Sequence, residues 1–167
     1  MSPLFMPAAA ALWFLPFVTP IAFFVAWSDL RYMRIPNEAV LTLVAVFAVV
    51  GVFVLSLEDY LWRWSHLLVV LVISFVMTAA KTLGAGDAKF ASAMAPFFAA
   101  QDIMFIAFLF MSVSLAALAT HRVVRQIPAI REQVPDWKSW KAAKFPMGLA
   151  LGTMLFIYLL VASIYGS

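Results

Sequence analysis

The sequence of 167 residues contains no cysteine and only two histidines, His66 and His121. The absence of cysteine excludes disulfide bonds, thiolate nucleophiles and cysteine-ligated zinc sites. The sequence also lacks a His-Glu-x-x-His motif and a Gly-x-Ser-x-Gly motif, which are the signatures of many zinc proteases and serine hydrolases. We therefore expect chemistry that needs neither a metal nor a cofactor.

Charge is scarce as well. Charged residues make up 11% of the chain and hydrophobic residues 66%, whereas a soluble domain is about a quarter charged and half apolar. This composition excludes both an ordinary soluble domain and a disordered chain. It predicts an all-α, polytopic membrane protein, since a spanning helix needs about 20 mostly apolar residues. No basic residue precedes Arg31, so a cleavable signal peptide is not expected.

The apolar runs predict a bundle of about six transmembrane helices. Residues 90–120 are apolar but interrupted at Gln101 and Asp102, so they could cross the membrane once or twice. The fourth span, about 87–100, is short for a bilayer, and we expect it to be tilted or shielded by its neighbours. The other clear spans are residues 8–27, 39–57, 66–80 and 145–165.

Counting basic residues decides between one crossing and two. With two crossings, the segments 28–37, 81–89 and 121–144 share one side and hold ten of the eleven basic residues, with Arg63 alone opposite. With one crossing the split becomes four against seven, which contradicts the positive-inside rule. We therefore predict six spans, three cytoplasmic basic loops and both termini on the outer, periplasmic side. The same rule explains the net charge of +3 without nucleic acid as a partner.

Two further expectations concern the loops. In the segment 121–144, the spacing of Trp137 and Trp140 beside Lys138 and Lys141 fits a short helix on the membrane surface with its rings in the lipid. A role in substrate docking is the alternative. Asp102 is expected to be a charge of an outer loop.

Asp29 ends the first predicted span and Asp87 begins the fourth, so both lie at the cytoplasmic face. Placing an acidic residue at a membrane boundary costs free energy, so such a residue is expected by default to have a function. Two neighbouring carboxyls can share one proton, so that one activates water and the other donates to a peptide carbonyl. The alternatives are that Asp87 caps a helix and that Asp29 pairs with Arg31 or Lys89.

Three blocks resemble the type IV prepilin peptidase family of Gly-x-Gly-Asp membrane aspartyl proteases. DLRYMRIPN (29–37) is similar to the family's first-aspartate signature, GAGDAK (84–89) to its second, and FPMGLAL (145–151) to its Pro-x-Gly-x-Ala segment. The resemblance covers about residues 20–155. It implies Asp29 and Asp87 as the catalytic pair and the following as supporting residues: Gly84, Gly86, Lys89, Arg31, Arg34, Pro36, Asn37, Pro146 and Gly148.

The resemblance implies a multi-pass protease of the bacterial inner membrane that removes the basic leader of prepilins or pseudopilins, with the lipid bilayer as its other partner. Longer members also N-methylate the new terminus through a domain with Cys-x-x-Cys motifs. Because this chain has no cysteine and no space for that domain, it is similar to the short, peptidase-only CpaA/TadV group of Flp-type tight-adherence pilus systems. We expect residues 1–167 to form one membrane-embedded peptidase domain, without a separate soluble methyltransferase domain.

Two other functions are compatible with parts of the pattern. A presenilin-like or signal-peptide-peptidase-like protease shares Gly-x-Gly-Asp but carries Tyr-Asp at the first aspartate, where this chain has Ser28-Asp29, and Pro-Ala-Leu late in the chain. A non-catalytic membrane subunit or small transporter would carry polar residues deep in its spans. The spans here hold only small ones such as Ser74 and Ser112, which suit close helix packing.

Overall fold

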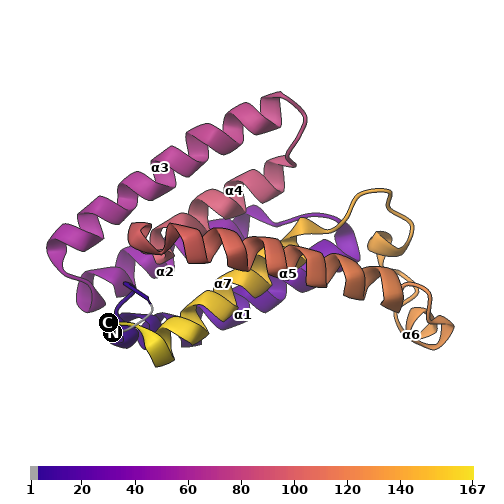
Figure 1. Ribbon diagram of the computed structural model, residues 1–167. Helices are drawn as coiled ribbons and strands as arrows, with labels where there is room; N and C mark the ends of the chain where they lie inside the picture. The colour runs from indigo at the N-terminus through magenta and orange to yellow at the C-terminus, as the bar shows by residue number, and fades with distance from the viewer. Residues whose placement is uncertain (1–3) are drawn as a thin grey trace.

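The structure is a computed structural model that describes residues 4–167. Its α-helices run back and forth along one direction (Figure 1). The helices are α1 (Ala8–Tyr32), α2 (Asn37–Val54), α3 (Leu57–Ala79), α4 (Ala85–Met94), α5 (Ile103–Val124), α6 (Pro128–Gln133) and α7 (Met147–Tyr165), with 3-10 turns η1 (Ala95–Phe97), η2 (Ala100–Asp102) and η3 (Lys138–Trp140). This confirms the all-α, polytopic prediction.

Five helical segments are long and apolar enough to cross a membrane: Ala8–Tyr32, Asn37–Val54, Leu57–Ala79, Ala100–Val124 and Met147–Tyr165. The predicted fourth span is instead the ten-residue α4 followed by η1. At 1.5 Å per residue, α4 is about 15 Å long, or half of the hydrocarbon core. It packs against α2, α3 and α7, which shield its polar Ser92 in contact with Ser74 of α3 at 3.3 Å.

The bundle brings the predicted basic loops to one end. In Figure 1 the α1–α2, α3–α4 and α5–α7 connections lie at the end opposite the two termini, which are marked N and C. An isolated β-bridge pairs Leu4 with Gly166 at the terminal end. The chain therefore traverses the bundle six times, with α4 as the short traverse.

The most extensive contact in the bundle is between α1 and α7. Phe14, Val18, Ala22 and Val25 are buried on α1, and their spacing of three or four residues places them on one helix face. On α7, Gly148 and Gly152 form a Gly-x-x-x-Gly pattern that permits close helix approach. A Cβ atom at Gly152 would lie 2.6 Å from the Ala22 carbonyl oxygen, so α7 can pack here only without a side chain.

The terminal end contains a buried polar network that the sequence did not predict. Asp102, expected as an outer-loop charge, lies in the 3-10 turn η2 and is only 4% exposed. Its carboxylate accepts the backbone N–H groups of Phe5 at 2.9 Å and Met6 at 3.3 Å, and the hydroxyl of Tyr158 at 2.7 Å. Arg63 is also buried and donates to Met6 Sδ and to the Pro96 carbonyl. Hydrogen-bond donors from distant segments thus occupy the Asp102 carboxylate, as the burial of a charged group requires.

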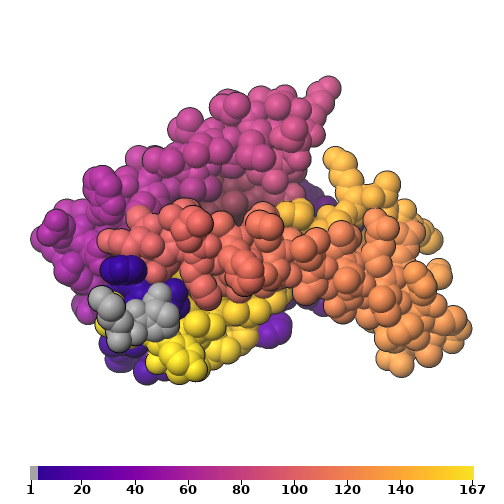
Figure 2. Space-filling view, viewed as in Figure 1, coloured from indigo at the N-terminus to yellow at the C-terminus, as the bar shows by residue number. Residues whose placement is uncertain are grey.

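The segment between α5 and α7 forms a lobe that projects beyond the bundle (Figure 2, orange). The expected surface helix with lipid-facing rings is wrong. Trp140 is buried in the 3-10 turn η3. Its ring stacks on Trp137 at 5.3 Å and on His121 at 5.4 Å between centroids, and its Nε1 donates to the Val134 carbonyl at 3.0 Å. The rings therefore hold the lobe together rather than enter lipid.

Candidate active site

Asp29 lies in the last turn of α1, at the end of the bundle that carries the basic loops. The chain turns sharply after it, because Met33 adopts a left-handed conformation (φ 55°) and donates its N–H to the Asp29 carbonyl at 2.9 Å. The Ser28 hydroxyl donates to the Arg34 carbonyl at 2.9 Å and fixes the following loop. The Asp29 side chain is 5% exposed, and its Oδ2 accepts the Gly148 backbone N–H at 2.6 Å.

Asp87 lies in the first turn of α4 and is half-buried. The two glycines of its motif have different neighbours. A Cβ at Gly84 would lie 2.6 Å from Asp87 Oδ2, and a Cβ at Gly86 would lie 3.4 Å from Ile35 Cβ. Gly84 therefore leaves space for the carboxyl to lie back over the start of α4. Gly86 lies beside Ile35 of the first motif, where a Cβ would make an ordinary van der Waals contact.

The two carboxyls are close enough to influence each other. The pKa of Asp87 is raised to about 6, first by burial and then by the negative charge of Asp29, against the opposing effects of the Gly84 backbone and the Lys144 charge. Asp87 lies outside the five membrane-length segments. The site thus retains a proton on a carboxyl at a pH where an ordinary aspartate, with a pKa near 3.9, is ionised.

The supporting residues of the first two motifs fix the backbone around this pair. Lys89 Nζ donates to Asn37 Oδ1 at 3.1 Å and so joins α4 to α2. Pro36 precedes α2 as its N-cap residue in an extended conformation. The Arg31 guanidinium lies over the rings of Trp27 and Tyr32 at 5.4 and 5.2 Å. In the described part of the chain, neither Arg31 nor Lys89, the two alternative partners of Asp29, forms a salt bridge to it.

The third motif lies at the start of α7. Pro146 is the N-cap residue of this helix, and Gly148 packs directly on Asp29, so that a Cβ at Gly148 would lie 2.8 Å from Asp29 Cβ. The sequence motif singled out Gly148, but not its hydrogen bond to a residue 119 positions away. The proximity of Lys144 to Asp87 was also missed, because a loop lysine carries no spacing signal.

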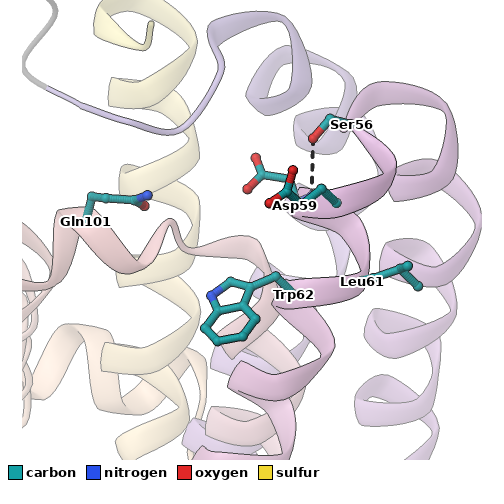
Figure 3. Close-up of a pocket in the computed structure, with 6 residues that line it drawn as sticks. Ser56, Asp59, Leu61, Trp62 and Gln101 are labelled. Atoms are coloured by element: carbon teal, nitrogen blue, oxygen red, sulfur yellow. Dashed lines mark hydrogen bonds between the residues drawn. The ribbon is translucent and has the colours of Figure 1, made fainter.

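A separate pocket opens at the other end of the bundle. It is lined by Ser56, Glu58, Asp59, Leu61, Trp62 and Gln101. Figure 3 shows Gln101 across the pocket from Asp59 and Trp62, and the Asp59 N–H bonded to the Ser56 hydroxyl. Neither aspartate of the two motifs lines this pocket. Among residues 4–167, no three His, Asp or Glu side chains cluster as a metal site would require.

The site therefore joins three sequence blocks that are far apart in the chain, and two of its carboxyls share a buried environment suited to acid–base chemistry. No curated protein and no solved structure matches the chain. The model of the type IV leader peptidase family matches residues 16–120, which is more than half of the chain and includes both motif aspartates. The chain therefore belongs to the type IV leader peptidase family, and it is a multi-pass membrane peptidase.

Proposed function

We propose that this peptidase is an aspartyl endopeptidase that cleaves the basic leader from type IV or Flp-type prepilins, with Asp29 and Asp87 as its catalytic pair. The observation that carries the proposal is the meeting of the two motif aspartates at one end of the bundle, close enough for the charge of Asp29 to raise the pKa of Asp87. Asp29 accepts the Gly148 N–H, and the Asp87 carboxyl lies over Gly84, where no side chain blocks it.

The chemistry follows from one shared proton. The ionised carboxyl takes a proton from water as the water oxygen attacks the scissile carbonyl carbon, and the protonated carboxyl donates to the carbonyl oxygen. Collapse of the resulting tetrahedral intermediate breaks the C–N bond, releasing a carboxylic acid and an amine. Like charges a few ångströms apart disfavour double ionisation, so the singly protonated pair is the working form.

The charge pattern supports cleavage at the cytoplasmic face of a bacterial inner membrane. The site lies at the end of the bundle that holds the three basic loops, and ten of the eleven basic residues fall in these loops. By the positive-inside rule this end faces the cytoplasm, where the leader of a membrane-inserted prepilin would lie. We also propose that residues 1–167 act as a single peptidase domain.

The test is co-expression with a Flp-type prepilin at matched membrane levels of wild type, Asp29→Asn and Asp87→Asn. Wild type should release the leader, and each variant should lose cleavage by at least about a thousandfold, as expected when one member of a catalytic pair is removed. Glu58→Gln is the matched control, because it removes an acidic group from the pocket at the other end. Cleavage retained by either aspartate variant would reject the pair.

A further inference from the structure

The hydrogen bond between Gly148 and Asp29 connects the last helix of the chain to the first. Gly148 is the second residue of α7, and the first N–H groups of a helix have no acceptor within the helix. One of them is satisfied here by the buried Asp29 carboxylate at 2.6 Å. Such short bonds are typical when the acceptor is charged.

The Gly148 N–H favours the negative form of Asp29, against burial, which disfavours it. A carboxylate at a helix N-terminus is stabilised by the partial positive charge of the helix end and by the N–H bond itself. Protonation at Oδ2 would direct a second hydrogen at the Gly148 N–H. The α7 terminus therefore holds Asp29 as an acceptor.

At Asp87, burial and the charge of Asp29 together disfavour the ionised form. Asp87 lies in the first turn of the shorter α4 and interacts with the Gly84 backbone and with Lys144, but burial and Asp29 outweigh these and raise its pKa to about 6. When the pair shares one proton, the proton thus belongs on Asp87.

We propose that the N-terminus of α7, through the Gly148 amide, assigns the two catalytic roles: Asp29 is the general base, Asp87 is the general acid, and Gly148 is the positioning residue. This inference rests on the proposed function. Asp29 takes a proton from water while the hydroxyl oxygen bonds to the scissile carbon, and Asp87 gives its proton to the carbonyl oxygen. Asp29 then gives its proton to the leaving nitrogen as the C–N bond breaks, and Asp87 regains one from a hydroxyl of the intermediate.

Gly152 provides a matched control for packing on the same helix face. A Cβ at Gly148 would lie 2.8 Å from Asp29 Cβ and 3.0 Å from Oδ2, whereas a Cβ at Gly152 would lie 2.6 Å from the Ala22 carbonyl oxygen. Alanine at either position disturbs the α1–α7 contact, but only Gly148→Ala displaces the carboxylate from its amide. A role in packing alone predicts the same outcome for both variants.

The first experiment is the pH profile of kcat/KM for prepilin cleavage. Gly148→Ala should move the acidic limb to higher pH by about one to two units, because the ionised form of Asp29 loses a bond to a charged acceptor. Gly152→Ala should lower the thermal stability and leave the limbs in place. The proposal would be overturned if an active Gly148→Ala protein kept the wild-type pH profile of kcat/KM. It would also be overturned if Gly148→Ala and Gly152→Ala shifted that profile equally.

A second measurement locates the proton without activity or a glycine variant. Infrared difference spectra of the full-length protein near pH 5 should show a protonated-carboxyl band that Asp87→Asn removes and Asp29→Asn retains. The reverse pattern would refute the assignment of roles. The expected bands together with a complete lack of prepilin cleavage by wild type would refute the proposed function alone.

Discussion

The Tyr158 hydroxyl donates to Asp102 Oδ2 at 2.7 Å and accepts the Ala99 N–H at 3.1 Å. Tyr158 lies on α7 between Gly148, which bonds to Asp29, and the terminal end of the helix. The same helix therefore makes buried hydrogen bonds at two levels of the bundle, through Gly148 and through Tyr158. Only the contact at Gly148 touches the candidate active site.

Removing the Tyr158 hydroxyl should lower stability and spare catalysis. Tyr158→Phe leaves the Ala99 N–H without its acceptor and Asp102 with two donors instead of three. We expect a loss of about 1–3 kcal/mol, since a buried group loses its partner. Thermal unfolding in detergent measures the loss, and Tyr165→Phe, on an exposed ring, is the control. Equal midpoints in the two variants would contradict this reading of the network.

Neutralising Asp87 should stabilise the protein while it abolishes cleavage. The folded protein holds a proton on Asp87 up to about pH 6, above the ordinary value of 3.8, so the folded state binds this proton more tightly than the unfolded chain. As the pH rises from 3.8 to about 6, wild type therefore loses the stability that this bound proton supplies. That stability does not return at higher pH. Asp87→Asn should be more stable by about 1–3 kcal/mol at pH 7, and the difference should vanish below about pH 4.

Unfolding midpoints measured at pH 4 and pH 7 check this expectation. Asp136→Asn is the control, because it makes the same chemical change on an exposed loop residue. An Asp87→Asn protein no more stable than wild type at pH 7 would show that burial of Asp87 carries no such cost.

Lys144, rather than Lys89, should tune the acid. The charge of Lys144 lowers the pKa of Asp87, whereas Lys89 bonds to Asn37. Lys144→Met should therefore move the alkaline limb of kcat/KM to higher pH by a few tenths of a unit, since an exposed charge acts weakly through solvent. Lys89→Met should leave that limb in place. A shift with Lys89→Met alone would reverse the assignment.

The lobe should loosen when its central ring is removed. Trp140 stacks on both His121 and Trp137, and η3 packs against α1. Trp140→Ala should speed cleavage of the 125–146 segment by added protease about tenfold or more in inverted membrane vesicles, because local opening becomes easier. Trp62→Ala, which removes an exposed ring elsewhere, should leave the rate unchanged. An unchanged rate in Trp140→Ala would indicate that the lobe is held by other contacts.

Local patterns predicted the parts of the fold that depend on them. The apolar runs predicted the membrane-length helices, and the basic loops predicted that both termini meet at one end. The same patterns placed Asp29 at the end of a helix and Asp87 at the start of one. Each of these features depends on composition or period within a short window.

Contacts between distant segments could not be predicted in this way. Asp102 has the sequence surroundings of an exposed loop residue, yet Phe5, Met6 and Tyr158 bury it. Trp140 has the spacing of a membrane anchor, yet its ring packs on His121. The Gly-x-x-x-Gly pattern at Gly148 and Gly152 was the available signal for the close contact of α7 with α1.

The pairing of α1 with α7 also sets the order in which the site can be completed. Asp29 belongs to α1, which leaves the ribosome before α7, the helix of its hydrogen-bond donor Gly148. Until α7 inserts, the buried face of α1 lacks its main partner. A nascent chain therefore carries both motif aspartates before the Gly148 N–H can reach Asp29, and the three motifs come together only when α7 docks.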